Sequence, residues 1–157
     1  MRLSGDQRAL ESFPLRLMIV AVVAAMSIVP AAEALESIQD RDFLSRAGLM
    51  MDKVVYAAQM LVMQGPGASR TVDLDFSSEG GLSATRMTVG DTPGGPYGNA
   101  VVLELSTGAK LVRLAQDPPA GMTSAFGQGL DVESCRFSLV METLISDGEC
   151  IVSVGVG

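Results

Sequence analysis

Apolar and polar residues follow three patterns along the chain. Residues 17–32 form an uncharged apolar run. Extending the run to residues 13–35 brings it to the length of a helix that spans a bilayer, at about 1.5 Å per residue against a core of about 30 Å. Residues 36–42 are polar, and from residue 43 to residue 64 apolar side chains recur every three or four positions. The pattern predicts an N-terminal helix over 7–64, apolar over 13–35 and amphipathic over 43–64.

Several residues indicate where this helix begins, bends or ends. Ser37 or Asp40 is suited to cap a fresh helix start, so a break near 36–42 is one alternative. Pro30 predicts a kink and not necessarily an end. The tripeptide at 65–67, Gly-Pro-Gly, ends the helix. We expect the amphipathic half to pack on a sheet, with a coiled-coil partner as the alternative.

The remaining residues, 68–157, alternate between apolar and polar positions over short runs, as β-strands do. The expected strands are 71–76, 84–89, 100–105, 110–115, 135–144 and 150–156. Residues 91–98 are a predicted loop, and residues 116–134 are predicted to be irregular. Short connections favour antiparallel pairing. The predicted fold class is therefore α+β: a long N-terminal apolar and amphipathic helix followed by a small antiparallel β-sheet domain.

The composition of the chain limits which partners and which catalytic chemistry are expected. The net charge is −7 over 157 residues, which argues against nucleic acid as a partner. The chain has no His, which removes the commonest general base and metal ligand. Asp73 and Asp75 alternate along one strand and could face a cation, but a solvated strand face is the favoured interpretation. We predict that the protein is not an enzyme and uses no metal or cofactor.

The two cysteines, Cys135 and Cys150, both lie in the last quarter of the chain. Export to an oxidising compartment would permit a disulfide between them, and two free thiols are the alternative. A tight turn at Asp147-Gly148 would place Cys150 opposite Ile145. In that case Cys135 lies beyond disulfide reach.

The N-terminal run allows an ordinary secretory signal or a plain membrane anchor. Ala32-Glu33-Ala34 matches the small-x-small cleavage pattern, so one alternative is cleavage after Ala34. The mature product would then be a secreted or anchored extracytoplasmic β-domain binding protein. If the run is a membrane anchor, the arginines before it predict a cytoplasmic N-terminus.

A third interpretation comes from a resemblance. The segment Gln7-Arg8-Ala9-Leu10-Glu11, ahead of an apolar helix, resembles the start of archaeal type IV pilin-like proteins with a class III (prepilin-type) signal peptide. The segment from Gln64 to Leu74 is similar to their junction between the helix and the first strand. The resemblance implies a leader at 1–6 and cleavage between Asp6 and Gln7, or one residue earlier, after Gly5.

The resemblance also implies a function. Glu11, the fifth residue after cleavage at Gln7, would neutralise the new amine of Gln7 during assembly. The protein would be a structural subunit of a type IV pilus-like surface filament, or a pseudopilin-like component. Its partners would be a prepilin peptidase, the membrane before assembly, and copies of itself or related subunits. The β domain would be extracytoplasmic, and extracellular after assembly.

Overall fold

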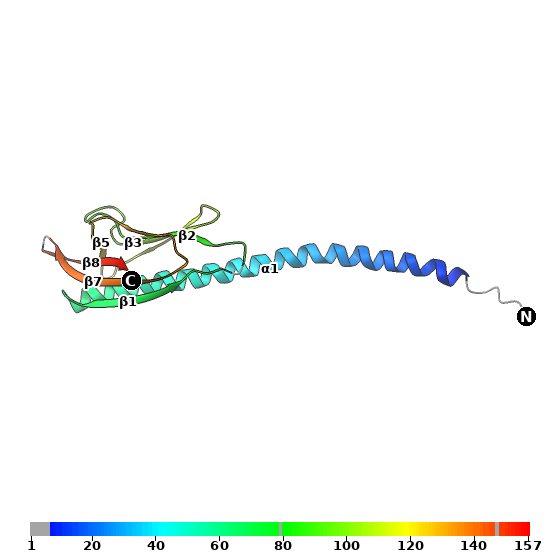
Figure 1. Cartoon of the computed structure of the whole chain (residues 1–157), viewed down its shortest axis with the longest axis horizontal. Coiled ribbons are helices and arrows are strands. Elements are labelled where there is room, and N and C mark those ends of the chain that lie inside the picture. The colour runs from blue at the N-terminus through cyan, green and yellow to red at the C-terminus, as the bar shows by residue number, and fades with distance from the viewer. Residues whose placement is uncertain (1–6, 79, 147) are drawn as a thin grey trace, which may run out of the picture. The chain divides into compact units, whose positions relative to one another are not determined.

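A computed structural model describes residues 7–78, 80–146 and 148–157, with the side chains of these residues except 7–15, 27, 29 and 30. In this part of the chain one long helix precedes eight strands (Figure 1). The elements are α1 (Gln7–Gln64), β1 (Ser69–Asp75), β2 (Ala84–Val89), β3 (Ala100–Leu105), β4 (Lys110–Leu114), β5 (Gly121–Ser124), β6 (Leu130–Val132), β7 (Arg136–Ser146) and β8 (Glu149–Val156). The predicted α+β class, a long helix followed by a β domain, is confirmed.

The chain divides into two compact units between Ile38 and Gln39, within α1. The helix is continuous through 36–42, so the interruption considered there is absent, and α1 does not end at Pro30. The carboxylate of Asp40 does not cap a new helix. Its Oδ1 accepts a hydrogen bond from the backbone N–H of Leu82 at 3.1 Å. The polar segment therefore serves a tertiary contact.

The strands of the second unit form two four-stranded sheets, with orders β1-β7-β8-β5 and β4-β3-β2-β6. Neighbouring strands are antiparallel, except that β5 runs parallel to β8. The prediction of an irregular segment at 116–134 is wrong, because β5 and β6 lie within it. Both strands are short, and Met122, Thr123 and Ser124 of β5 are all buried. No alternation of apolar and polar residues marks β5.

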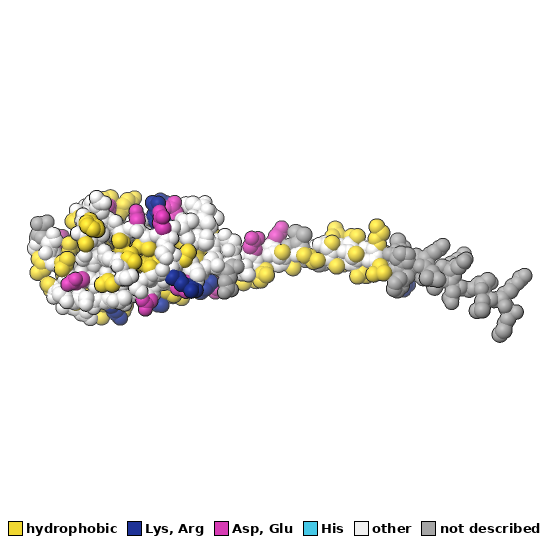
Figure 2. All heavy atoms as spheres, in the orientation of Figure 1, with side chains coloured by type: hydrophobic (Ala, Val, Ile, Leu, Met, Phe, Trp, Pro, Cys, Tyr) yellow, Lys and Arg dark blue, Asp and Glu magenta, His cyan; other side chains and the backbone are white. Residues whose placement is uncertain are grey.

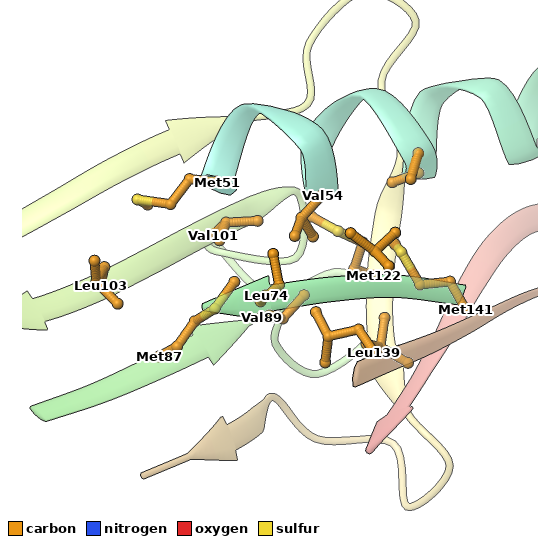
Figure 3. Packing of buried hydrophobic residues seen from close by; sticks show 14 of the residues in the cluster. Met51, Val54, Leu74, Met87, Val89, Val101, Leu103, Met122, Leu139 and Met141 are labelled. Atoms are coloured by element: carbon orange, nitrogen blue, oxygen red, sulfur yellow. The ribbon is translucent and has the colours of Figure 1, made fainter. Parts of the chain in front are cut away.

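The core of the second unit lies between the C-terminal part of α1 and both sheets. Met51 and Val54 of the helix point toward Leu74 of β1 and Val101 of β3 (Figure 3). The most deeply buried helix residues are Phe43, Ala47, Met51, Val54, Ala57, Ala58 and Leu61. Their spacing of three and four confirms that this half of the helix packs on a sheet.

The helix ends where predicted, and buried hydrogen bonds fix the end. Gly65 and Gly67 have φ values of 90° and 83°, which residues with a Cβ atom rarely adopt. The Gly67 N–H donates to the carbonyl of Thr143 at 2.9 Å. The fully buried hydroxyl of Thr143 lies 3.3 Å from the carbonyls of Leu61 and Ala68. Thr143 of β7 thus connects the last turn of α1 to the sheet.

Candidate functional site: an exposed apolar helix

The first unit presents large apolar side chains on all sides of α1. Within residues 17–38 their exposed fractions run from 51% at Val22 to 74% at Met26. Figure 2 shows hydrophobic side chains over much of this helical segment, with a few acidic side chains among them. The exposed large hydrophobic residues are Leu17, Met18, Ile19, Val20, Val22, Val23, Met26, Ile28, Leu35 and Ile38. We call residues 17–38 the apolar segment.

By length and composition, α1 is able to cross a membrane. The apolar segment has 22 residues, from 17 to 38, and so extends about 33 Å at 1.5 Å per residue. Its backbone groups are paired within the helix, as a bilayer requires. Arg16 lies just before it, and Glu33 and Glu36 fall in its last turns. The segment fits a bilayer or a bundle of similar helices better than it fits water.

The residues predicted to act in leader cleavage and assembly lie at the beginning of the chain. Asp6 is outside the described residues. Gln7 begins α1 and Glu11 lies in its second turn, but both side chains are outside the description. Cleavage at Asp6-Gln7 and pairing of Glu11 with the amine of Gln7 therefore stay predictions.

The acidic pair on β1 contacts polar side chains of β7. The Ser138 hydroxyl donates to Asp73 Oδ1 at 2.5 Å, and Arg136 Nε lies 2.9 Å from Asp75 Oδ2. Hydrogen bonds from the hydroxyl and backbone N–H of Ser77, together with Arg136, lower the pKa of Asp75 to about 2. Among the described residues no three His, Cys, Asp or Glu side chains come together as a metal site. This arrangement fits a solvated strand face.

The two cysteines are separated by the length of β7. Cys150 is opposite Ile145 in the β7–β8 pair, as expected for the turn at Asp147-Gly148. Cys135 directly precedes Arg136 at the far end of β7. The ten residue steps from 135 to 145 extend about 34 Å, whereas a disulfide needs Cα atoms within about 7 Å. Both thiols are free in this structure, and the register rules out a bond between them within one molecule.

Two grooves of the second unit were not anticipated from the sequence. One, of about 670 Å³, lies on the outer face of the β4-β3-β2-β6 sheet, with Tyr97, Lys110 and Asp131 among its lining residues. The other, of about 340 Å³, lies between α1 and β1, beside Tyr56 and Arg70. Their lining residues come from segments distant in sequence, so no local pattern could have indicated either groove.

Comparison of the chain with models of protein families, with curated proteins and with solved structures found no match.

Proposed function

We propose that this protein is a membrane-anchored structural subunit that assembles with copies of itself through the apolar segment. The assembly would be a type IV pilus-like surface filament or a related pseudopilin-like structure. One observation carries the proposal: a continuous helix has large apolar side chains at least half exposed in its first half and packs into a β domain with its second half. The N-terminal motif from Gln7 to Glu11 supports the same interpretation.

Physical chemistry favours two successive environments for the apolar segment. In the bilayer, lipid covers the exposed side chains, and helices gain little hydrophobic energy from one another. Outside the bilayer, burial of the same surface is worth about 25 cal/mol per Å², so the helices would pack firmly side by side. Assembly then needs machinery that extracts the helices, and the β domains would form the outer surface.

Glu11 has a specific role in this proposal. A carboxylate among apolar helices is costly unless a positive charge is paired with it. Cleavage between Asp6 and Gln7 would create an ammonium group four residues before Glu11. Pairing between these two groups, within one subunit or between neighbours, would neutralise both. The prepilin peptidase would thus create the partner that Glu11 requires.

The alternative function is a secreted or anchored β-domain binding protein, and one observation favours it. Cleavage after Ala34 would leave the second unit whole, because that unit begins at Gln39 and its buried helix residues begin at Phe43. The product would keep its core and lose the apolar segment. Binding in one of the two grooves would then be its function.

Electron microscopy of surface material from the native cells tests the assembly. The proposal expects filaments labelled by an antibody against the β domain, and it expects Glu11→Ala to abolish them while the protein still reaches the membrane. Glu33→Ala is the matched control, because Glu33 follows the apolar run. Cells that bind the antibody but carry no filaments would contradict the filament proposal. Filaments that persist in both Glu11→Ala and Glu33→Ala would contradict the role proposed for Glu11.

A further inference from the structure

We infer that the free edge of strand β4 binds an extended segment of another polypeptide, which joins the sheet as a further strand. β4 is an outermost strand of the β4-β3-β2-β6 sheet, so only one of its two sides is paired, with β3. Main-chain hydrogen bonds at such an edge give a partner strand its affinity, and side chains at alternate positions give it specificity. This surface belongs to the β domain and does not involve the apolar segment, so it goes beyond the proposed function.

The register of β4 shows which of its backbone groups are free. Just after the strand, the N–H of Ala115 donates to the carbonyl of Asn99, which precedes β3, at 2.8 Å. In an antiparallel pair successive residues turn their backbone groups to opposite sides, so every second residue counted back from Ala115 faces β3. The backbone groups of the remaining residues face away from the sheet, and these residues are Lys110, Val112 and Leu114. Their three N–H groups have no hydrogen-bond partner in the part of the chain that the structure describes.

The other three edge strands are protected against such pairing. Natural sheets protect their edges with charged side chains, very short strands or covering loops. β1 has Asp73 and Asp75 among its exposed residues, and β6 has only three residues. β5 is covered by a loop, because its Met122 carbonyl accepts a hydrogen bond from the N–H of Asp91 at 3.2 Å. β4 has five residues and one charged side chain on its outer face, Lys110 at its first position, so most of its edge is open.

The side chains on the outer face of β4 define the chemistry of the partner. Val112 and Leu114 are apolar and are 44% and 45% exposed. Lys110 is exposed and forms no ion pair within the described residues. On the paired side, β3 places two apolar residues and one acidic residue opposite these three: Ala100, Val102 and Glu104. The same complementarity on the free side favours an antiparallel segment with apolar residues at two alternate positions and an acidic residue two positions later.

A synthetic peptide with this pattern tests the edge: Thr-Val-Thr-Val-Thr-Glu-Thr, acetylated and amidated at its ends. The peptide is added to the isotope-labelled full-length protein in dodecylmaltoside micelles, and amide hydrogen exchange is followed by NMR. At a peptide concentration of about ten times Kd the edge is free about a tenth of the time, so exchange at Val112 and Leu114 should slow about tenfold. The N–H of Asp73, which faces away from β7 on the protected edge of β1, is the internal control and should not change.

A pair of variants at Val112 tests the backbone contact. The Val112 carbonyl also accepts a hydrogen bond from Nη1 of Arg113 at 3.2 Å, so the outward N–H is the group to remove. Val112→Pro removes it, and an edge strand tolerates proline where the N–H faces solvent. The affinity for the peptide should fall at least about fivefold, through the loss of one hydrogen bond. Val112→Thr keeps the N–H and the branched side chain, so it is the matched control and should bind within about twofold of the natural protein.

A charge exchange at Lys110 tests the acidic position of the partner and leaves the backbone of β4 unchanged. Lys110→Glu should weaken binding of the peptide by about two- to fivefold. It should strengthen, by a similar factor, binding of a second peptide that has Lys in place of Glu. This reversal decides the matter even if Val112→Pro fails to fold, since an unchanged order of the two peptides would overturn the pairing.

Three further results would overturn the proposed edge site. Peptide binding without slower exchange at Val112 would place the peptide elsewhere on the protein. Equal affinities of folded Val112→Pro and Val112→Thr would exclude the backbone contact. Exchange at Val112 that slows with protein concentration, without peptide, would assign the edge to a second copy of this chain. None of these results depends on whether microscopy finds filaments, so the edge site and the proposed function stand or fall separately.

Discussion

The two halves of α1 are both rich in apolar residues, yet they have opposite surroundings. Between residues 17 and 38 the large apolar side chains are at least half exposed. Between residues 43 and 61 the core-facing side chains are at most 3% exposed. The first half presents apolar residues on every side, with Glu33 and Glu36 in its last turns, and the second half concentrates its apolar residues on particular faces. The arrangement of apolar residues around a helix, more than their number, determines whether a sheet, a bilayer or other helices can cover it.

The largest expected effect comes from truncating one buried side chain in the second half. Leu61→Ala should destabilise the second unit by about 2–5 kcal/mol, because it removes methyl groups and leaves a cavity in the core. Ile19→Ala, the same kind of change in the apolar segment, should shift that stability by less than about 0.5 kcal/mol. Denaturant unfolding in detergent, followed by the near-ultraviolet circular dichroism of the tyrosines, measures both. Equal losses in the two variants would contradict the division between the halves.

The next effect concerns the hydrogen bonds of Thr143, which connect the end of α1 to strand β7. Thr143→Val removes a buried hydroxyl that faces two carbonyls at the end of the helix. We expect a loss of about 0.5–1.5 kcal/mol in the free energy of unfolding, because the hydroxyl hydrogen bond is lost while the carbonyls of Leu61 and Ala68 keep the N–H groups of Gly65 and Thr143 as donors. Thr71→Val, on the exposed side of β1, is the control and should change little. A neutral Thr143→Val would show that the helix end does not depend on this hydroxyl.

A smaller effect, of opposite sign, is expected at Gly48. A Cβ atom there would lie 3.2 Å from Nη2 of Arg113, whose Nε is 2.9 Å from Asp52 Oδ1. The guanidinium is the end of a flexible, half-exposed side chain and can move slightly. Gly48→Ala should therefore stabilise the unit by up to about 1 kcal/mol through helix propensity. Destabilisation in the unfolding measurement would mean that Arg113 is held rigidly, and Arg113→Ala in the same background should then restore the gain.

The smallest effect is the pH dependence carried by Asp75. Its pKa is about 2 in the folded protein and 3.8 as the ordinary value, so the carboxylate stabilises the fold above pH 3.8. That contribution disappears as the pH falls through about 2. Asp75→Asn should lower the unfolding midpoint slightly at pH 6, and this difference should shrink as the pH falls toward 2. A difference at pH 2 as large as that at pH 6 would assign the effect to something other than this charge. The Asp75 side chain is 46% exposed, and solvent screening keeps the effect small.

The sequence predicted those parts of the fold that depend on local signals. Apolar periodicity located the buried face of α1, and Gly-Pro-Gly at 65–67 located its end. The expected turn at Asp147-Gly148 matches the pairing of Ile145 with Cys150. The parallel strand β5 and the role of Thr143 could not be predicted in this way. Both depend on contacts between segments far apart in the sequence. In the sequence, a threonine that will be buried in a strand cannot be distinguished from one that will be exposed.

The candidate site was predictable to a different degree. Residues 17–32 are uncharged and, apart from Ser27, apolar, so the sequence predicted a continuous apolar helix at this place. The exposed apolar residues of the second half of α1, Leu49, Tyr56 and Met63, were harder to recognise, because the core-facing residues of the same helix have a similar spacing. Only the burial of Met51 and Val54 distinguishes the face that is covered from the face that is free.

The most direct test is the N-terminal sequence and intact mass of the protein isolated from its native cells. The account requires that the mature molecule retain its apolar segment, and it predicts a chain that begins at Gln7 or Asp6 and partitions with membranes or surface filaments. A freely soluble chain that begins at Leu35 would contradict it, because residues 17–34 could then hold no subunit in a bilayer or against its neighbours.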